Sequence, residues 1–140
     1  MAKKGLLGIA ATAALICCAL LGAQGGPKDK IERGRYLVEE LGKCQECHTP
    51  RLENGDLNRA KWLKGAMVVT KPSYPVKKWE EMAPDLTLSG TAKEWGEAGL
   101  AKFLETGVGP EGQKADPPMP LYKLKPADAE AIAAYLNSLQ

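Results

Sequence analysis

The sequence predicts an all-α domain. Apolar residues recur at helical spacing along three segments, and no run of residues alternates convincingly in the way that a half-buried strand does. The chain has 140 residues, of which 27–140 are expected to form one folded domain. A net charge of +2 lacks the strong basic excess of a nucleic-acid-binding protein. With three Trp, four Tyr and one Phe, the core is expected to need more than side chains to fill it.

Residues 1–26 are predicted to be a signal peptide or an N-terminal membrane anchor. Two lysines precede an uncharged apolar stretch, 5–23, which is the pattern of an export signal. Because about 20 apolar residues can cross a bilayer, cleavage after Gly25 and retention as an anchor both stay open. Lipidation at Cys17 or Cys18 is less favoured, because no small residue precedes either of them. We therefore expect an exported protein, in the periplasm or at the outer face of the cytoplasmic membrane.

The folded domain is predicted to begin with a helix over 29–42. Gly34 weakens a helix, so its presence within this apolar stripe suggests that another helix crosses closely there. A second helix is expected over 91–106. Thr91 has the capping-box spacing to a glutamate three residues later, and Gly107 supplies a C-terminal stop.

The last helix is expected to start at Pro126, a residue suited to the first turn. Its apolar stripe is rich in alanine, which would let another helix approach closely, and Gly34 is the natural counterpart. The stretch 49–84 is rich in Pro, Gly, Asn and Lys and has no helical period. It is predicted to be a long surface excursion, with a short strand at 67–69.

The chemistry is carried by Cys44-Gln45-Glu46-Cys47-His48. This is C-x-x-C-H, the attachment motif of a c-type haem. Thiols at this spacing can form thioethers with the two vinyl groups on one edge of the porphyrin, and the histidine then projects its imidazole towards the iron. His48 must be neutral to bind, with its other ring nitrogen held by an acceptor that the sequence does not reveal.

Three rival interpretations of the motif are weaker. A thioredoxin-like redox pair is expected near a βαβ pattern, and the sequence shows none. A structural zinc site needs four ligands, whereas the motif offers at most three. A structural disulfide between Cys44 and Cys47 suits an exported protein but leaves the adjacent His48 unexplained. His48 is also the one histidine of the chain, which excludes a bis-histidine centre within it.

The second axial ligand is then expected to be a methionine thioether. Met67, Met82 and Met119 are the candidates in the folded part of the chain. Met119 is favoured because it lies shortly before the last helix, among prolines that hold its loop extended. Met67 and Met82 are expected to fill gaps in the core instead.

Together these features resemble a class I cytochrome c, and in particular the cytochrome c domains of bacterial periplasmic dehydrogenases. The resemblance implies that the first and last helices cross beside the haem and that the middle helix lies beneath it. Two departures are the lysine before Pro126, where a Ser or Thr cap is usual, and the length of the 49–84 excursion. The matching segments are 44–51, 83–87, Trp95, Phe103, 107–112, 118–120 and 127–139. The residues that would meet at the crossing are Gly34, Tyr36 and Leu37 with Ile132, Tyr135 and Leu136.

The resemblance implies a one-electron carrier with a single haem c, ligated by His48 and Met119, rather than an enzyme. Its partners would be redox proteins such as a dehydrogenase, an oxidase or a bc-type complex. Two alternatives stay open: a haem subunit of a membrane-bound dehydrogenase complex, and a haem sensor or enzyme with an open ligand position. Residues 28–78 carry 12 basic and 7 acidic residues, and 79–140 carry 5 and 10. This asymmetry either orients a charged partner or is simply solvated surface.

Overall fold

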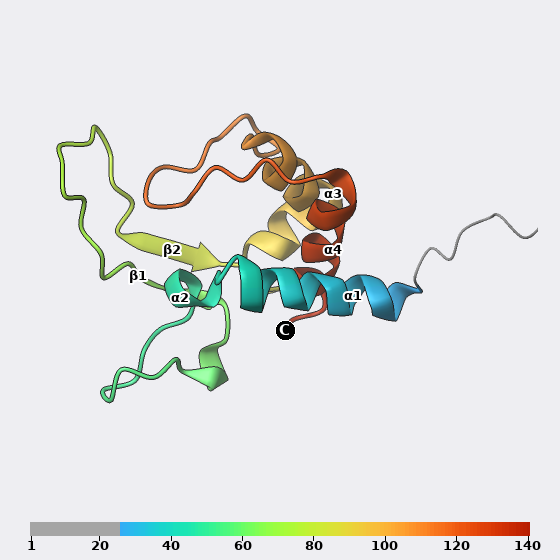
Figure 1. Cartoon of the computed structure of the whole chain (residues 1–140), viewed down its shortest axis with the longest axis horizontal. Coiled ribbons are helices and arrows are strands. Elements are labelled where there is room, and N and C mark those ends of the chain that lie inside the picture. Colours follow the sequence, from blue (N-terminus) through green and yellow to red (C-terminus); the bar gives the residue numbers. More distant parts are fainter. Residues whose placement is uncertain (1–25) are drawn as a thin grey trace, which may run out of the picture.

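The computed structural model describes residues 26–140. Its body consists of three helices, α1 (Pro27–Tyr36), α3 (Thr91–Thr106) and α4 (Pro126–Asn137), and α4 packs against both of the others (Figure 1). The mostly helical architecture that the sequence predicts is therefore confirmed. The predicted leader lies outside the described residues, apart from Gly26. None of the helices in the described part of the chain combines the length and the hydropathy that a bilayer crossing requires.

The first helix ends in a π-helical turn, which is wider than an α-helical turn and lies just before the Cys–His motif. α1 begins at Pro27 and passes directly into η1 (Leu37–Leu41), a π-helical turn, so that the helical segment is 27–41 rather than 29–42. The wide turn is closed by the Gly42 N–H, which donates to the Leu37 carbonyl at 2.7 Å. A π-turn holds one more residue than an α-turn, and it therefore changes the direction in which the chain leaves the helix.

The close approach of α1 and α4 at Gly34 is confirmed. A Cβ placed on Gly34 would lie 1.9 Å from the Ala131 carbonyl oxygen and 2.8 Å from Cβ of Tyr135. The prediction that Tyr36 joins this interface is wrong, since its side chain is 46% exposed and lies beside the Arg33 guanidinium. Successive helical residues are about 100° apart, so Tyr36 is on the opposite side of α1 from Gly34.

The bounds predicted for α3 are confirmed, but its cap is not. Thr91 is the first helical residue, and Gly90 occupies the N-cap position without any side-chain hydrogen bond. The helix is interrupted at Gly96, whose φ of 63° lies in a region that favours glycine. Gly107 ends the helix with a left-handed φ of 75°, as the sequence predicts. Before the interruption, Trp95 packs edge-to-face on Phe103 at 5.2 Å between ring centroids.

The excursion contains a two-stranded antiparallel ribbon, β1 (Lys64–Met67) and β2 (Met82–Asp85). β1 begins three residues before the predicted strand. In the ribbon, Ala66 pairs with Ala83 and Met67 pairs with Met82. Both alanines are 8% exposed, whereas the methionines are 71% and 55% exposed. The prediction that these methionines fill the core is therefore wrong, because neighbouring strand residues face opposite sides.

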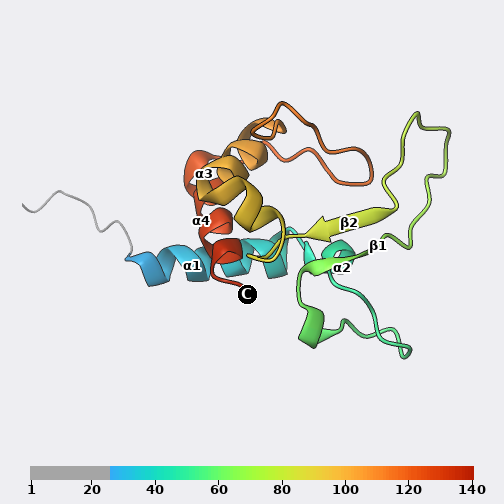
Figure 2. The ribbon, with the colours of Figure 1, turned by 180° about the vertical axis from the view of Figure 1, so that it is seen from behind.

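The ribbon lies at one end of the molecule, beside the short helix α2 (Gln45–His48). Figure 2 shows, from behind, that the loops before β1 and between β1 and β2 extend away from the three long helices. The first of these loops includes a short 3₁₀ turn, η2 (Arg59–Lys61). The buried apolar core joins the long helices to the motif side of the molecule through Leu63. Its members are Leu37, Val38, Leu63, Ala92, Leu100, Ala101, Leu104, Ala129, Ala131, Ile132, Ala133, Tyr135 and Leu136.

Candidate functional site

The Cys–His motif folds into a single helical turn. Cys44 is the N-cap of α2, and its carbonyl accepts the His48 N–H at 2.9 Å. Residues three apart in a helix share a face, so the turn places the thiols of Cys44 and Cys47 on one side. The Cys44 N–H donates to the Val38 carbonyl at 3.0 Å, which ties the turn to the end of η1. The first helix and the core thereby fix the position of both thiols.

His48 is held as a buried, neutral imidazole. Its side chain is buried, with the residue 5% exposed, and Nδ1 lies 2.8 Å from the Pro84 carbonyl oxygen. A carbonyl can only accept a hydrogen bond, so Nδ1 carries the proton and Nε2 keeps its lone pair. Burial lowers the pKa of His48 from its ordinary value, against the opposing effect of the Pro84 hydrogen bond. Pro84 is the acceptor that the sequence could not reveal.

The two thiols are free and differ in exposure. Cys44 is partly buried and Cys47 is exposed. Burial raises the pKa of the Cys44 thiol to about 11. Tyr122 lies beside them, with its pKa raised by burial and then by the nearby cysteines, and its hydroxyl donates to the Gly42 carbonyl at 3.4 Å. Sequence reasoning missed Tyr122, because a lone tyrosine in a loop carries no pattern.

The chain that leaves the motif is anchored by a buried hydrogen bond. Thr49 is 1% exposed, and its hydroxyl oxygen accepts the Leu63 N–H at 2.9 Å. Leu63 is fully buried and has a φ of 56°, a left-handed conformation that costs a non-glycine residue about 1–2 kcal/mol. Its carbonyl accepts the Leu86 N–H at 2.9 Å. These two bonds attach the residue just before β1 to the chain that leaves the motif and to the chain that follows β2. They thereby help to fix the position of the strand that carries Pro84.

Gln45, inside the motif, has a buried amide with one unsatisfied atom. Its Nε2 donates to the Glu39 carbonyl at 2.8 Å, whereas Oε1 has no hydrogen-bond partner within residues 26–140. Leaving a buried acceptor unpaired costs roughly 1–3 kcal/mol. The Gln45 amide therefore ties the motif to Glu39 in η1 through one hydrogen bond.

Met119 lies on the long loop between α3 and α4. It is half-buried, and its N–H donates to the Asp116 carbonyl at 3.2 Å. Within the described residues, no hydrogen bond joins this loop to 44–48. The loop instead contacts the segment before β2, where the Glu80 N–H donates to the Pro117 carbonyl at 2.7 Å. The structure thus unites the thiols and His48. The loop that carries Met119 approaches them at two points, through the segment that carries Pro84 and through the Tyr122 hydroxyl, which donates to the Gly42 carbonyl.

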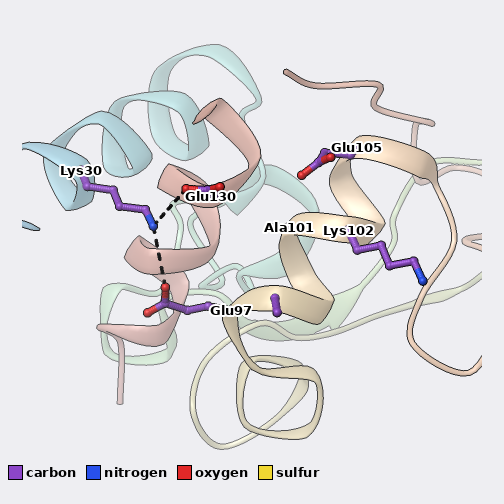
Figure 3. A pocket seen from close by; sticks show the side chains of 7 residues that line it. Lys30, Glu97, Ala101, Lys102, Glu105 and Glu130 are labelled. Atoms are coloured by element: carbon purple, nitrogen blue, oxygen red, sulfur yellow. Dashed lines mark ion pairs between the residues drawn. The ribbon is translucent and has the colours of Figure 1, made fainter. Parts of the chain in front are cut away.

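One groove of the surface lies away from the motif. It has a volume of about 400 Å³ and is lined by side chains of α1, α3 and α4 (Figure 3). Its α1 residue, Lys30, lies near the start of that helix, whereas the motif follows the other end. Its Lys30 pairs with Glu130 at 3.4 Å and with Glu97 at 4.0 Å. The described lining contains no thiol or imidazole. The motif turn is therefore the candidate site.

The donor set of the turn fits a c-type haem. Two thiols one helical turn apart could provide covalent attachment, and a buried neutral imidazole, with Nδ1 held by a carbonyl, could offer Nε2 to an iron. Among residues 26–140, no group of three or more His, Cys, Asp or Glu side chains is arranged to hold a metal ion. The ribbon is antiparallel, so the turn does not sit in a βαβ unit of the thioredoxin kind.

Comparison with known families agrees with this donor set. The family model for cytochrome c matches residues 31–140. The chain belongs to the cytochrome c family. Cytochromes c bind a covalent c-type haem and carry electrons, and both properties therefore hold for this cytochrome c. The resemblance that the sequence shows is confirmed.

The curated relatives of this cytochrome c include components of dehydrogenases. It is 37% identical over 119 residues to a diheme cytochrome c-type protein of Cereibacter sphaeroides, covering 81% of this chain and 37% of the relative. It is 35% identical over 119 residues to the fructose dehydrogenase cytochrome subunit of Gluconobacter japonicus, covering 79% and 22%. It is 32% identical over 126 residues to the gluconate 2-dehydrogenase cytochrome c subunit of Pantoea cypripedii, covering 78% and 26%. The chain thus spans well under half the length of each of these relatives.

Proposed function

We propose that this cytochrome c is an exported one-electron carrier with a single haem. Cys44 and Cys47 would hold the haem through thioethers, and His48 and Met119 would be the protein ligands of its iron. The observation that carries the proposal is the hydrogen bond between His48 Nδ1 and the Pro84 carbonyl at 2.8 Å. It fixes the tautomer in which Nε2 is free to bind iron.

The protein's contribution is to position its ligands. The Pro84 carbonyl sets the orientation of the imidazole, and burial keeps His48 neutral so that no proton competes for Nε2. The thioether of Met119 favours the ferrous state and raises the reduction potential. The bound haem supplies the one-electron chemistry. With His48 and Met119 as its protein ligands, the iron would have no coordination position for a substrate, so we infer that the protein transfers electrons and is not itself an enzyme.

Spectra of the matured protein test this proposal. The protein would be produced in a host that exports it and attaches haem, and its mass would show one haem per chain. We expect the oxidised form to have a thioether-to-iron band and the reduced form to resist carbon monoxide. Met119→Ala should lose the band and bind carbon monoxide readily, whereas Met67→Ala and Met82→Ala should resemble the parent. An unmodified protein that binds carbon monoxide freely would instead favour the open-site sensor or enzyme.

The relatives favour a second candidate, a haem subunit of a dehydrogenase complex. Two of the relatives described above are named as cytochrome subunits of dehydrogenases, and they match this chain over most of its length. In such a complex, the chain would receive electrons from the catalytic subunit and pass them to an oxidase or a bc-type complex. Co-purification with a dehydrogenase activity from the native host at low salt would support this assembly. A haem protein that migrates alone would support a free carrier.

Export of the protein is part of the same proposal and rests on its N-terminal residues. Residues 1–26 are proposed to direct the chain to the periplasm or the outer face of the cytoplasmic membrane, as a cleaved signal or as an anchor. Cell fractionation and the N-terminal sequence of the mature protein distinguish the two outcomes. A protein that starts near residue 26 in the soluble fraction was cleaved, whereas one retained in the membrane with 5–23 intact is anchored.

A further inference from the structure

One short segment of the excursion contacts the elements that carry both proposed iron ligands. The segment is 78–84, which ends in β2. At its C-terminal end, the Pro84 carbonyl accepts the hydrogen bond from Nδ1 of His48. The segment is bonded at this point to the histidine side of the site. Its position is fixed by the pairing of Ala83 with Ala66 in the ribbon.

At its N-terminal end, the same segment holds the loop that carries Met119. The Lys78 ammonium pairs with the Asp116 carboxylate, and the Glu80 N–H donates to the Pro117 carbonyl at 2.7 Å. The Asp116 carbonyl, in turn, accepts the Met119 N–H at 3.2 Å. Lys78 is therefore two contacts away from the proposed ligand, through the turn that Asp116 begins.

We propose that segment 78–84 is a clamp that keeps the Met119 loop closed over the iron, and that Lys78 is its positioning residue. The inference rests on the proposed function, because it concerns the residue assigned there as the second axial ligand. It also gives the long excursion a role. The excursion departs after the motif and returns through the clamp, so its path joins the loop of one ligand to the hydrogen-bond partner of the other.

The clamp acts on the equilibrium between closed and open loops. In this clamp, the open state is the one in which the loop moves away from the segment, releases the Met119 sulfur and breaks the Lys78–Asp116 pair. The pair thus lowers the population of the open loop, in which an added ligand can reach the iron. Exposed ion pairs are weak, so removing this one is expected to raise the open population by roughly two- to five-fold.

Imidazole titration of the oxidised holoprotein measures this population. Imidazole binds where Met119 leaves, and its apparent dissociation constant falls in proportion as the open population rises. We expect Lys78→Ala and Asp116→Asn each to lower this constant by about two- to five-fold. The exchanged pair Lys78→Asp/Asp116→Lys should return it towards the parental value. Lys77→Ala is the matched control, because Lys77 is an exposed neighbour with no ion pair within residues 26–140.

The outcomes separate the clamp from the function on which it rests. An unmodified protein without a thioether-to-iron band would overturn the assignment of Met119 before any titration. An intact band with the same imidazole constant in Lys78→Ala and in the parent would overturn the clamp alone. An equal shift in Lys77→Ala and Lys78→Ala would overturn it too, because that result reflects general surface charge. High salt should bring the parent close to Lys78→Ala, since it screens the pair.

Discussion

Gly34→Ala tests the helix crossing on which the domain depends. The added methyl group would lie 1.9 Å from the Ala131 carbonyl oxygen, 2.6 Å from the carbonyl carbon and 2.8 Å from Cβ of Tyr135. Two of these three atoms belong to the backbone of α4, so no side-chain rotation relieves the overlap. Ordinary non-bonded contacts lie at about 3.5 Å. The helices would therefore have to separate by about 1.5 Å.

The change in the free energy of unfolding that we expect from Gly34→Ala is the balance of two opposing effects. Overpacking of a core costs about 1–3 kcal/mol and occasionally more. A backbone clash between two helices belongs at or above the upper end of that range. Alanine in place of glycine within a helix returns about 1 kcal/mol. We therefore expect Gly34→Ala to lower the free energy of unfolding by about 2–3 kcal/mol, which is a large share of the stability of a domain this size.

Guanidinium titration of the holoprotein, followed by far-ultraviolet circular dichroism, measures this loss. The midpoint should fall, with a slope close to that of the parent if the native packing is otherwise kept. Lys28→Ala, at an exposed position on the same helix, is the control and should leave the midpoint nearly unchanged. A Gly34→Ala protein as stable as the parent, or more stable, would refute the close crossing, because only the gain in helix propensity would then remain.

Two further substitutions test bonds near the site and the core. Thr49→Val removes the acceptor of the Leu63 N–H and leaves a buried donor unpaired. Chemical denaturation should therefore show that the free energy of unfolding falls by about 1–3 kcal/mol. Thr49→Ser, which keeps the hydroxyl, should retain most of the stability. Tyr135→Phe removes a hydrogen bond of 2.6 Å to Glu39 and should cost about 1–2 kcal/mol at neutral pH. Burial and the Glu39 hydrogen bond raise the pKa of Tyr135 to about 12. Because the pKa is higher in the folded state, the protonated hydroxyl stabilises the fold fully below the unfolded pKa of about 10. The difference in the free energy of unfolding between the parent and the Phe variant should therefore be constant up to that pH and shrink as the pH approaches 12. A difference that grows with pH would contradict the assignment.

Local patterns predicted the helices well. The alanine stripe after Pro126 and the glycine at position 34 describe the same contact from its two sides, and the structure brings them together. The motif likewise predicted its own geometry, since the spacing of Cys44, Cys47 and His48 fits one helical turn. Each of these patterns is local, because the residues that form it are adjacent or within a few helical turns of one another.

The features that the sequence could not predict depend on distant contacts. The π-turn of η1 has no signature in the sequence pattern, because a regular helical period predicts that Leu41 faces the core, whereas Leu41 is 61% exposed. The exposure of Met67 follows from its pairing across the ribbon, which is set by residues fifteen or more positions away. The Pro84 carbonyl is a backbone group, which every residue carries, and nothing in the side chains marks it as the partner of His48.

The Met119–iron bond is the central claim, and proton NMR of the reduced holoprotein tests it most directly. A methyl group bound through sulfur to the iron lies over the porphyrin, whose ring current moves its resonance far upfield. We predict one such methyl resonance in the parent, its loss in Met119→Ala, and its retention in Met67→Ala and Met82→Ala. Retention of the resonance in Met119→Ala, or its loss in either of the other two variants, would contradict the account.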